Sequence, residues 1–119
     1  DVSERTIQFA EMATGCLVVG KSFDTFCPLG PAIATGLDPT DLELRARVNG
    51  EPRQAINTAD LLFSVAQLVA YISDAITLLP GDVIITGTPA GVGPVTPGDR
   101  VEIEIAGIGV LGNPVVAEG

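Results

Sequence analysis

The chain contains no histidine and no tryptophan. The absence of histidine excludes histidine-based catalytic triads and histidine general bases, and it removes a common ligand of zinc. No apolar stretch reaches the roughly 18 residues that predict a transmembrane helix, and no signal peptide is recognisable. The formal net charge of −9 disfavours nucleic acid and anionic membranes as partners. We therefore expect a chain that binds neither nucleic acid nor a membrane.

Cysteine is scarce as well. Cys16 and Cys27 are the only two, and they lack the Cys-x-x-Cys spacing of metal and redox motifs. We expect both to be buried small hydrophobic residues in a reducing compartment, which indicates a cytoplasmic protein. A disulfide between them is the alternative.

The rest of the composition is typical of a globular protein. Of the 119 residues, 46% are hydrophobic and 18% are charged, which argues against disorder and favours a single domain over residues 1–119. The apolar surplus predicts a face that is buried by another chain or by a missing part of the same chain. Because the sequence opens at Asp1 inside a motif, we expect an N-terminal part to be absent.

Strands are expected to dominate the fold. Residues 42–48 alternate apolar and charged side chains, which predicts a strand with one dry face. Asn49-Gly50 is a strong hairpin signal, and Pro52 in the returning strand 51–56 indicates a sheet edge. The apolar runs 16–19 and 83–85 predict short buried strands, and further strands are expected at 101–105 and 110–116.

Two helices are expected beside these strands. Ser3 can cap a short helix that begins at Glu4, and Ser64 can cap the main helix, which extends to about Ile76. No β-α-β alternation is present. The predicted fold class is therefore α+β, mainly β with one main helix.

Three segments end an apolar run in a polar loop, where binding and catalytic residues tend to lie. They are residues 1–3, 20–25 and 86–93. Asp1 is a possible ligand of a hard cation such as Mg²⁺ or Ca²⁺. Lys21, the only lysine, either reaches solvent along apolar surface or is a charge placed in a site. Gly87, Gly91 and Gly93 either let a ligand approach the backbone or belong to an ordinary surface loop.

Several sequence words occur in one order along nearly the whole chain. They are DVSERTIQ (1–8), GKSFDTFCPLGP (20–31), LRARVNGE (44–51), PGDVIITGTPAGVGP (80–94) and IAGIGVLGNPV (105–115). Together they resemble the C-terminal half of the catalytic domain in the fumarylacetoacetate hydrolase family, which includes 2-hydroxyhepta-2,4-diene-1,7-dioate isomerases. The resemblance implies a mixed β-roll or sandwich around a central site, present here in part, and a homodimer.

The resemblance also implies a divalent metal, Mg²⁺, Mn²⁺ or Ca²⁺, held by three carboxylates. Asp1 would be one of them, and the other two form a Glu-x-Glu pair in a preceding half that this sequence does not contain. Lys21 would be the catalytic residue. Gln8, Thr25 and Thr88 would contact the substrate.

Members of this family act on small oxo or diketo acids, as in aromatic catabolism. They hydrolyse carbon–carbon bonds, decarboxylate, or isomerise keto and enol forms, and the resemblance implies a metal-stabilised enolate in this chain's reaction. Two positions differ from the family pattern, since Thr6 stands where aspartate is usual and no Trp or Tyr accompanies the lysine word. The alternatives are a non-catalytic or incomplete chain that keeps the fold and pairs with another chain, and a β-rich binding module without metal.

Overall fold

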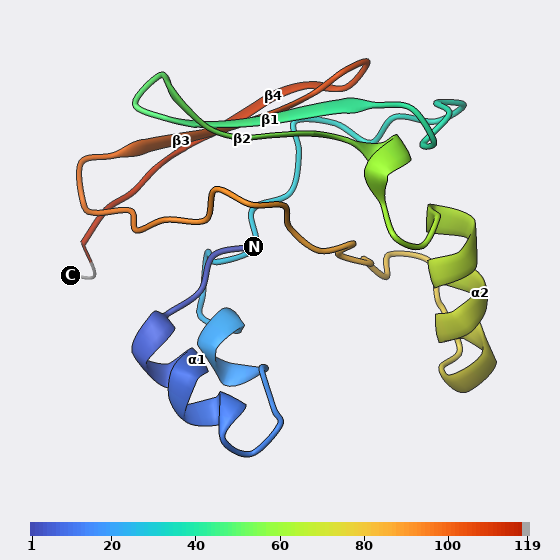
Figure 1. Ribbon diagram of the computed structural model, residues 1–119, viewed down its shortest axis with the longest axis horizontal. Coiled ribbons are helices and arrows are strands. Elements are labelled where there is room, and N and C mark those ends of the chain that lie inside the picture. Colours follow the sequence, from blue (N-terminus) through green and yellow to red (C-terminus); the bar gives the residue numbers. More distant parts are fainter. Residues whose placement is uncertain (118–119) are drawn as a thin grey trace. The chain divides into compact units, whose positions relative to one another are not determined.

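The chain folds as two compact units, Asp1–Gly30 and Pro31–Gly119. The computed structural model describes residues 1–117. The first unit holds helix α1 (Arg5–Met12) and the 3₁₀ turn η1 (Val19–Lys21) (Figure 1). The second holds the strands β1 (Glu43–Val48), β2 (Glu51–Asn57), β3 (Arg100–Ile105) and β4 (Gly109–Pro114), the 3₁₀ turn η2 (Thr58–Asp60) and helix α2 (Val65–Ala75). The predicted α+β class is confirmed.

The second unit is built on a four-stranded antiparallel sheet with the strand order β2-β1-β3-β4. The hairpin between β1 and β2 turns at Asn49 and Gly50, whose φ angles of 54° and 82° are left-handed. A tight two-residue hairpin of the type I′ class requires this backbone, and Asn-Gly adopts it readily. Pro52 lies on β2, which is an edge strand, so its missing N–H costs no bond to a second neighbour. The predicted hairpin and edge position are both confirmed.

One face of the sheet is mainly apolar. Directly opposite residues on antiparallel strands share a face, and the register places four residues in one row across the sheet. They are Gln54, Ala46, Ile103 and Leu111. Ala46 is the one buried hydrophobic residue within the described part of the chain, and many large apolar side chains are exposed. This exposure agrees with the expectation of a covered face.

The other face of the sheet carries charged side chains. The Arg47 guanidinium lies 2.5 Å from the Glu104 carboxylate, and Arg45 pairs with Glu43 at 2.8 Å. Both pairs are partly exposed, so each contributes little to stability. They confirm the wet face that the alternation of β1 predicts.

Helix α2 begins as predicted. The Ser64 hydroxyl accepts a hydrogen bond from the Gln67 backbone at 3.2 Å, and the Gln67 side chain accepts one from the Ser64 backbone at 2.8 Å. This reciprocal capping box satisfies two amides that a helix start leaves without partners. Among the helices described for residues 1–117, none combines the length and the apolar character of a membrane-crossing segment.

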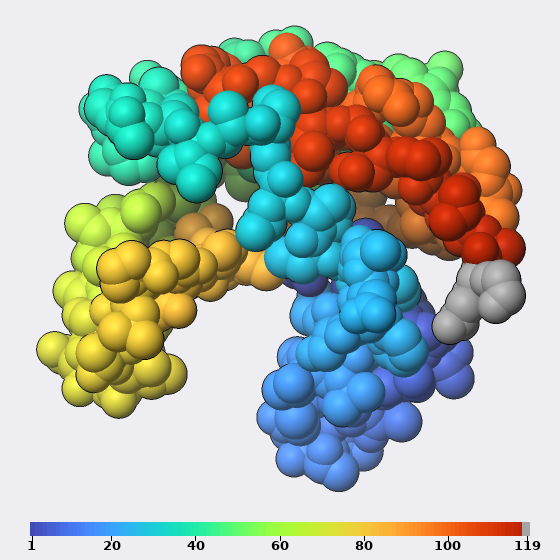
Figure 2. Space-filling model, turned by 180° about the vertical axis from the view of Figure 1, so that it is seen from behind, coloured from blue at the N-terminus to red at the C-terminus, as the bar shows by residue number. Residues whose placement is uncertain are grey.

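The first unit corrects one predicted cap. Residues 1–30 form one body, shown in blue shades in Figure 2. Helix α1 is capped by Glu4, whose carboxylate accepts from the Ile7 N–H at 2.6 Å. The prediction that Ser3 is the cap is wrong, because its hydroxyl instead accepts a hydrogen bond from Lys21.

The predicted buried strand at Cys16–Val19 is also wrong. The backbone N–H groups of Val18, Val19 and Gly20 donate to the Glu11 carboxylate at 3.2, 2.7 and 2.7 Å. Amides that bond a carboxylate are not available to a neighbouring strand. The segment therefore turns into η1, with its side chains exposed.

Two further expectations, a buried strand at 83–85 and buried cysteines, are wrong. Val83–Ile85 forms no strand, and the side chains of Val83 and Ile85 are exposed. Cys16 and Cys27 are exposed free thiols, neither buried nor joined in a disulfide. Neither an apolar run nor the spacing of two cysteines identifies the residues that would cover them.

The backbone of η1 approaches α1 most closely at Gly20. A Cβ atom added at Gly20 would lie 3.0 Å from both the Cβ and the backbone N of Gln8. We expect Gly20→Ala to lower the free energy of unfolding by about 1–3 kcal/mol, because helix backbone cannot move aside as a flexible side chain can. Denaturant unfolding followed by circular dichroism measures this change.

Gly93→Ala is the matched control for that substitution. A Cβ atom there would meet only the mobile guanidinium of Arg53 at 3.3 Å, so the change in stability should stay within about 0.5 kcal/mol. Equal effects of the two substitutions would contradict the close approach of η1 to α1.

The bonds to Glu11 predict a pH dependence. The Gly20 N–H, followed by those of Val19 and Val18, lowers the pKa of Glu11 below its ordinary value of 4.5, against an opposing effect of desolvation. A carboxyl whose pKa falls on folding stabilises the protein above its unfolded pKa, and this stability is lost as the pH falls through the folded pKa. We therefore expect Glu11→Gln to destabilise at neutral pH, and its difference from wild type to shrink below pH 4.5.

Urea unfolding at several values between about pH 3 and pH 7 checks this expectation. Glu51→Gln serves as control, because the Glu51 carboxylate has no hydrogen-bond or ion-pair partner within residues 1–117. A difference between wild type and Glu11→Gln that is the same at every pH would refute the role given to the carboxylate.

Candidate functional site

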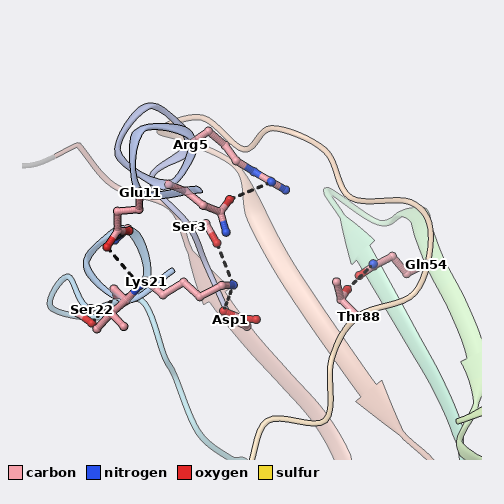
Figure 3. A network of polar contacts seen from close by, with 11 residues as sticks. Asp1, Ser3, Arg5, Glu11, Lys21, Ser22, Gln54 and Thr88 are labelled. Carbon is pink, nitrogen blue, oxygen red and sulfur yellow. Dashed lines mark hydrogen bonds and ion pairs between the residues drawn. The ribbon is translucent and has the colours of Figure 1, made fainter. Parts of the chain in front are cut away.

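Lys21 ends the 3₁₀ turn η1, and its side chain reaches the start of the chain. Its ammonium donates to Asp1 Oδ1 at 2.5 Å and to Ser3 Oγ at 3.0 Å (Figure 3). The side chains of Lys21 and Asp1 are 34% and 29% exposed. The lysine is therefore a charge held by specific partners, and the reading of a free side chain that reaches solvent is not supported.

Backbone hydrogen bonds hold residues 1–4 beside the lysine turn. The Val2 N–H donates to the Phe26 carbonyl at 2.9 Å, and the Glu4 N–H donates to the Gly20 carbonyl at 2.8 Å. These bonds flank Asp1 and Ser3 and leave their side chains turned toward Lys21. The ion pair therefore joins two segments that the backbone already brings together.

Gln8 is the buried polar residue of this unit, at 7% exposure. Its side-chain oxygen accepts from the Arg5 guanidinium at 3.0 Å, and that guanidinium lies 6.0 Å from the centre of the Phe9 ring. Gln8 also packs beneath Gly20, one residue before Lys21. The structure thus places Gln8, a predicted substrate contact, next to the lysine turn and buried from solvent.

Thr25 is exposed and has a φ angle of 69°. Left-handed backbone is uncommon for a β-branched residue and costs about 1–3 kcal/mol. The rings of Phe23 and Phe26 on either side of it are 5.3 Å apart and tilted. Within residues 1–117, the Thr25 side chain has no hydrogen-bond partner, so no hydrogen bond joins it to Lys21.

Thr88 belongs to the second unit and lies in the loop that precedes β3. Its Oγ1 accepts a hydrogen bond from Gln54 Nε2 at 2.9 Å (Figure 3). Gly91 in the same loop contacts the chain itself, since an added Cβ would lie 2.0 Å from the Arg53 carbonyl oxygen. The backbone at Gly91 therefore packs closely against β2. No Cβ contact arises at Gly87, which faces open space.

The structure therefore divides the predicted residues between its two units. Asp1 and Lys21 are in direct contact, and Gln8 lies beside their turn, whereas no hydrogen bond within residues 1–117 joins Thr25 to them. Thr88 belongs to the other unit. That Thr88 shares one site with Lys21 stays a prediction.

Sequence reasoning missed two polar partners. Ser3 was assigned to a helix cap, and no local signal separates that role from a bond to Lys21, eighteen residues away. Gln54 carried no such signal either, because a regular Asn49-Gly50 hairpin would pair it with Arg45, and it faces Ala46 only through the register shift between Ala46 and Arg47. A polar side chain at such a position needs a hydrogen-bond partner.

The donor set bears on a metal. Within residues 1–117, no three side chains of the types Asp, Glu, Cys and His gather into a cluster that could hold a cation. Asp1 supplies one hard oxygen ligand of the kind that Mg²⁺, Mn²⁺ and Ca²⁺ accept. The described residues therefore suit one side of a metal site and do not complete one.

Comparison with known proteins identifies relatives along the whole chain. Protein Rv2993c of Mycobacterium tuberculosis is 51% identical over 122 residues, which cover 100% of this chain and 45% of that protein. The bovine oxaloacetate tautomerase FAHD2A, a mitochondrial protein, is 46% identical over 126 residues, which cover 98% of this chain and 40% of the relative. The chain thus spans less than half the length of these two relatives.

Solved structures give the same result. The 5-carboxymethyl-2-hydroxymuconate delta-isomerase of Mycobacterium smegmatis matches with a TM-score of 0.93 and 53% identity, over 98% of this chain and 45% of that one. The maleylpyruvate hydrolase of Sphingobium sp. SYK-6, in complex with manganese(II) and pyruvate, matches with a TM-score of 0.79 and 46% identity. That match covers 82% of this chain and 38% of the hydrolase.

The family model described as fumarylacetoacetate (FAA) hydrolase C-terminal matches residues 1–116. The resemblance inferred from the sequence words is confirmed by this match and by the structures at 46–53% identity. The chain belongs to the fumarylacetoacetate hydrolase family and carries its C-terminal domain.

Proposed function

We propose that the full-length protein is a metal-dependent enzyme that acts on a small oxo acid through an enolate. The observation that carries this proposal is the ammonium of Lys21, fixed at 2.5 Å from the Asp1 carboxylate. Relatives named as an isomerase, a hydrolase and a tautomerase support it. The three reactions share negative charge that develops on a carbonyl oxygen, which a fixed cationic donor stabilises.

Lys21 is suited to that electrostatic role. An ammonium offers three N–H donors and no acceptor, and Asp1 and Ser3 engage two of the donors. The remaining N–H can donate to a substrate oxygen. Since two partners hold the ammonium in place, little reorganisation is needed when charge develops on the substrate.

We propose that Asp1 is one ligand of a divalent cation, Mg²⁺ or Mn²⁺, and that the further carboxylates come from outside residues 1–119. The manganese(II) and pyruvate of the Sphingobium hydrolase support a divalent cation beside an oxo acid. Such a cation, when bound, would draw electron density from the oxygens of the oxo acid. One oxygen of the Asp1 carboxylate would then bind the cation, and the other would accept the hydrogen bond from Lys21.

The remaining predicted residues would bind and orient the substrate. Gln8 lies next to the lysine turn, and Thr25 and Thr88 are exposed residues that carry hydroxyl groups. We propose that the three donate hydrogen bonds to substrate oxygens, in a homodimeric cytoplasmic enzyme. The names of the relatives favour hydrolysis and keto–enol isomerisation as candidate reactions, and the family resemblance adds decarboxylation as a third.

The exposure of apolar side chains favours a second candidate, a non-catalytic chain that pairs with other protein. Ile33 is 95% exposed and Leu62 is 88% exposed. Surface of this kind indicates contact with further polypeptide. The two candidates differ in whether the assembled protein turns over an oxo acid.

Lys21→Met tests the role of the ammonium. We expect kcat/KM for oxaloacetate tautomerisation, or for maleylpyruvate hydrolysis if that is the active substrate, to fall by about 100-fold or more, because a positioned charge donor is lost. Steady-state assays of the full-length protein measure it. Arg45→Met is the matched control, since it removes an exposed charge that pairs only with Glu43 within the described residues. Full turnover in Lys21→Met would refute the assignment.

Asp1→Asn tests the metal ligand. We expect EDTA to abolish turnover and added Mn²⁺ or Mg²⁺ to restore it, and we expect Asp1→Asn to weaken Mn²⁺ binding by more than about tenfold in titration calorimetry, because the ligand loses its charge. Asp74→Asn on the exposed side of α2 is the control. Activity that survives exhaustive chelation would rule out the metal, and unchanged Mn²⁺ affinity in Asp1→Asn would rule out this ligand.

A further inference from the structure

Gln54 is a polar residue on the apolar face of the sheet. It lies opposite Ala46, in the row that continues through Ile103 and Leu111. Its side chain leaves this row toward the loop that holds Thr88 (Figure 3). A half-buried amide among apolar neighbours is costly unless its hydrogen bonds are made. The two hydrogen bonds of Gln54 offset this cost, and they indicate what the residue does at this position.

The Gln54 amide nitrogen makes both contacts. Nε2 donates to Thr88 Oγ1 at 2.9 Å and to the Pro89 carbonyl oxygen at 2.9 Å. A carbonyl oxygen only accepts, so the atom beside Pro89 must be the NH₂ group and cannot be the amide oxygen. The orientation of the amide is thereby fixed, and both of its N–H groups are used.

This orientation makes the Thr88 hydroxyl the acceptor in its bond with Gln54. A hydroxyl has one proton and two lone pairs, and Gln54 occupies a lone pair. The Thr88 proton is not needed for that bond. Because Thr88 is exposed, the proton is available to an oxygen that arrives from solvent.

Gln54 is also the polar anchor of the loop. Within residues 1–117, no other hydrogen bond joins residues 86–93 to a strand. Gly91 packs on the same stretch of β2, where an added Cβ would lie 2.0 Å from the Arg53 carbonyl and 3.0 Å from Gln54 Cγ. The loop is thus held on β2 by the packing of Gly91 and by the hydrogen bonds of Gln54. Of these two contacts, only that of Gln54 orients the Thr88 side chain.

We propose that Gln54 is a positioning residue that commits Thr88 to donating its proton to a carboxylate or enolate oxygen of the substrate. This inference rests on the proposed function for the class of substrate. It adds a specificity rule, since the Thr88 proton is then kept for a ligand that presents an acceptor oxygen.

Gln54→Glu tests this inference with almost no change in shape. A carboxylate cannot donate to Thr88 or Pro89, and it takes the Thr88 proton for itself. We expect pyruvate, used as the probe in the presence of Mn²⁺, to bind the full-length protein about tenfold or more weakly, as for loss of a hydrogen bond to a charged group. Thr88→Val should show a similar loss, and Thr88→Ser should retain binding.

The double variant separates positioning from general damage. If Gln54 acts through Thr88, Gln54→Glu should weaken binding little further once Thr88→Val is present. Gln67→Glu is the matched control, because it makes the same change of charge at a capping-box position where glutamate also serves. Its pyruvate affinity should equal that of wild type.

Titration calorimetry of these variants gives outcomes that can be told apart. Wild-type affinity in Gln54→Glu, or equal losses in the presence and absence of Thr88→Val, would overturn the role of Gln54 alone. A wild-type protein that neither binds pyruvate nor turns over oxaloacetate or maleylpyruvate would overturn the proposed function and this inference together. Weak binding in both single variants without an added loss in the double variant supports the inference.

Discussion

The carboxylate of Glu11 is the interaction on which the first unit depends. A short 3₁₀ turn leaves its leading amides without partners inside the turn, and Glu11 on α1 accepts from the N–H groups of Val18, Val19 and Gly20. The turn is therefore anchored to the helix before Lys21 begins. The absence of a side chain at Gly20 allows the approach that these bonds require.

The position of the ammonium follows from this anchoring. The ion pair of Lys21 with Asp1 is about a third exposed, and pairs of that kind contribute little to stability. Backbone bonds of Val2 and Glu4 fix the partner segment independently. The pair is thus a result of the fold rather than a cause of it, and this condition suits a charge that must be in place before a substrate arrives.

Prediction from the sequence succeeded where the signals were local. The alternation along β1, the Asn49-Gly50 turn and the Ser64 cap each depend on neighbouring residues, and all three are present in the structure. The strands expected at 16–19 and 83–85 are absent. An apolar run indicates side chains that avoid water, but it does not supply the neighbouring strand whose hydrogen bonds make a sheet.

The candidate site shows the same limit. Asp1 and Lys21 were paired through the family resemblance, whereas Ser3 and Gln54 became visible only through contacts between distant residues. Ser3 and Glu4 can both cap a helix, and the choice between them depends on Lys21. The polarity of Thr88 likewise depends on a residue 34 positions earlier in the chain.

Lys21 and Thr88 have in common that each offers a hydrogen-bond donor. Asp1 and Ser3 occupy two of the three ammonium donors, and Gln54 leaves the Thr88 proton free. The chain has a formal net charge of −9, which repels an anionic acid at long range. Salt screens that repulsion beyond about 8–10 Å, so recognition has to come from contacts at hydrogen-bond distance. Donors held by partners that are themselves fixed meet this requirement, because they attract an acceptor oxygen without first having to reorient.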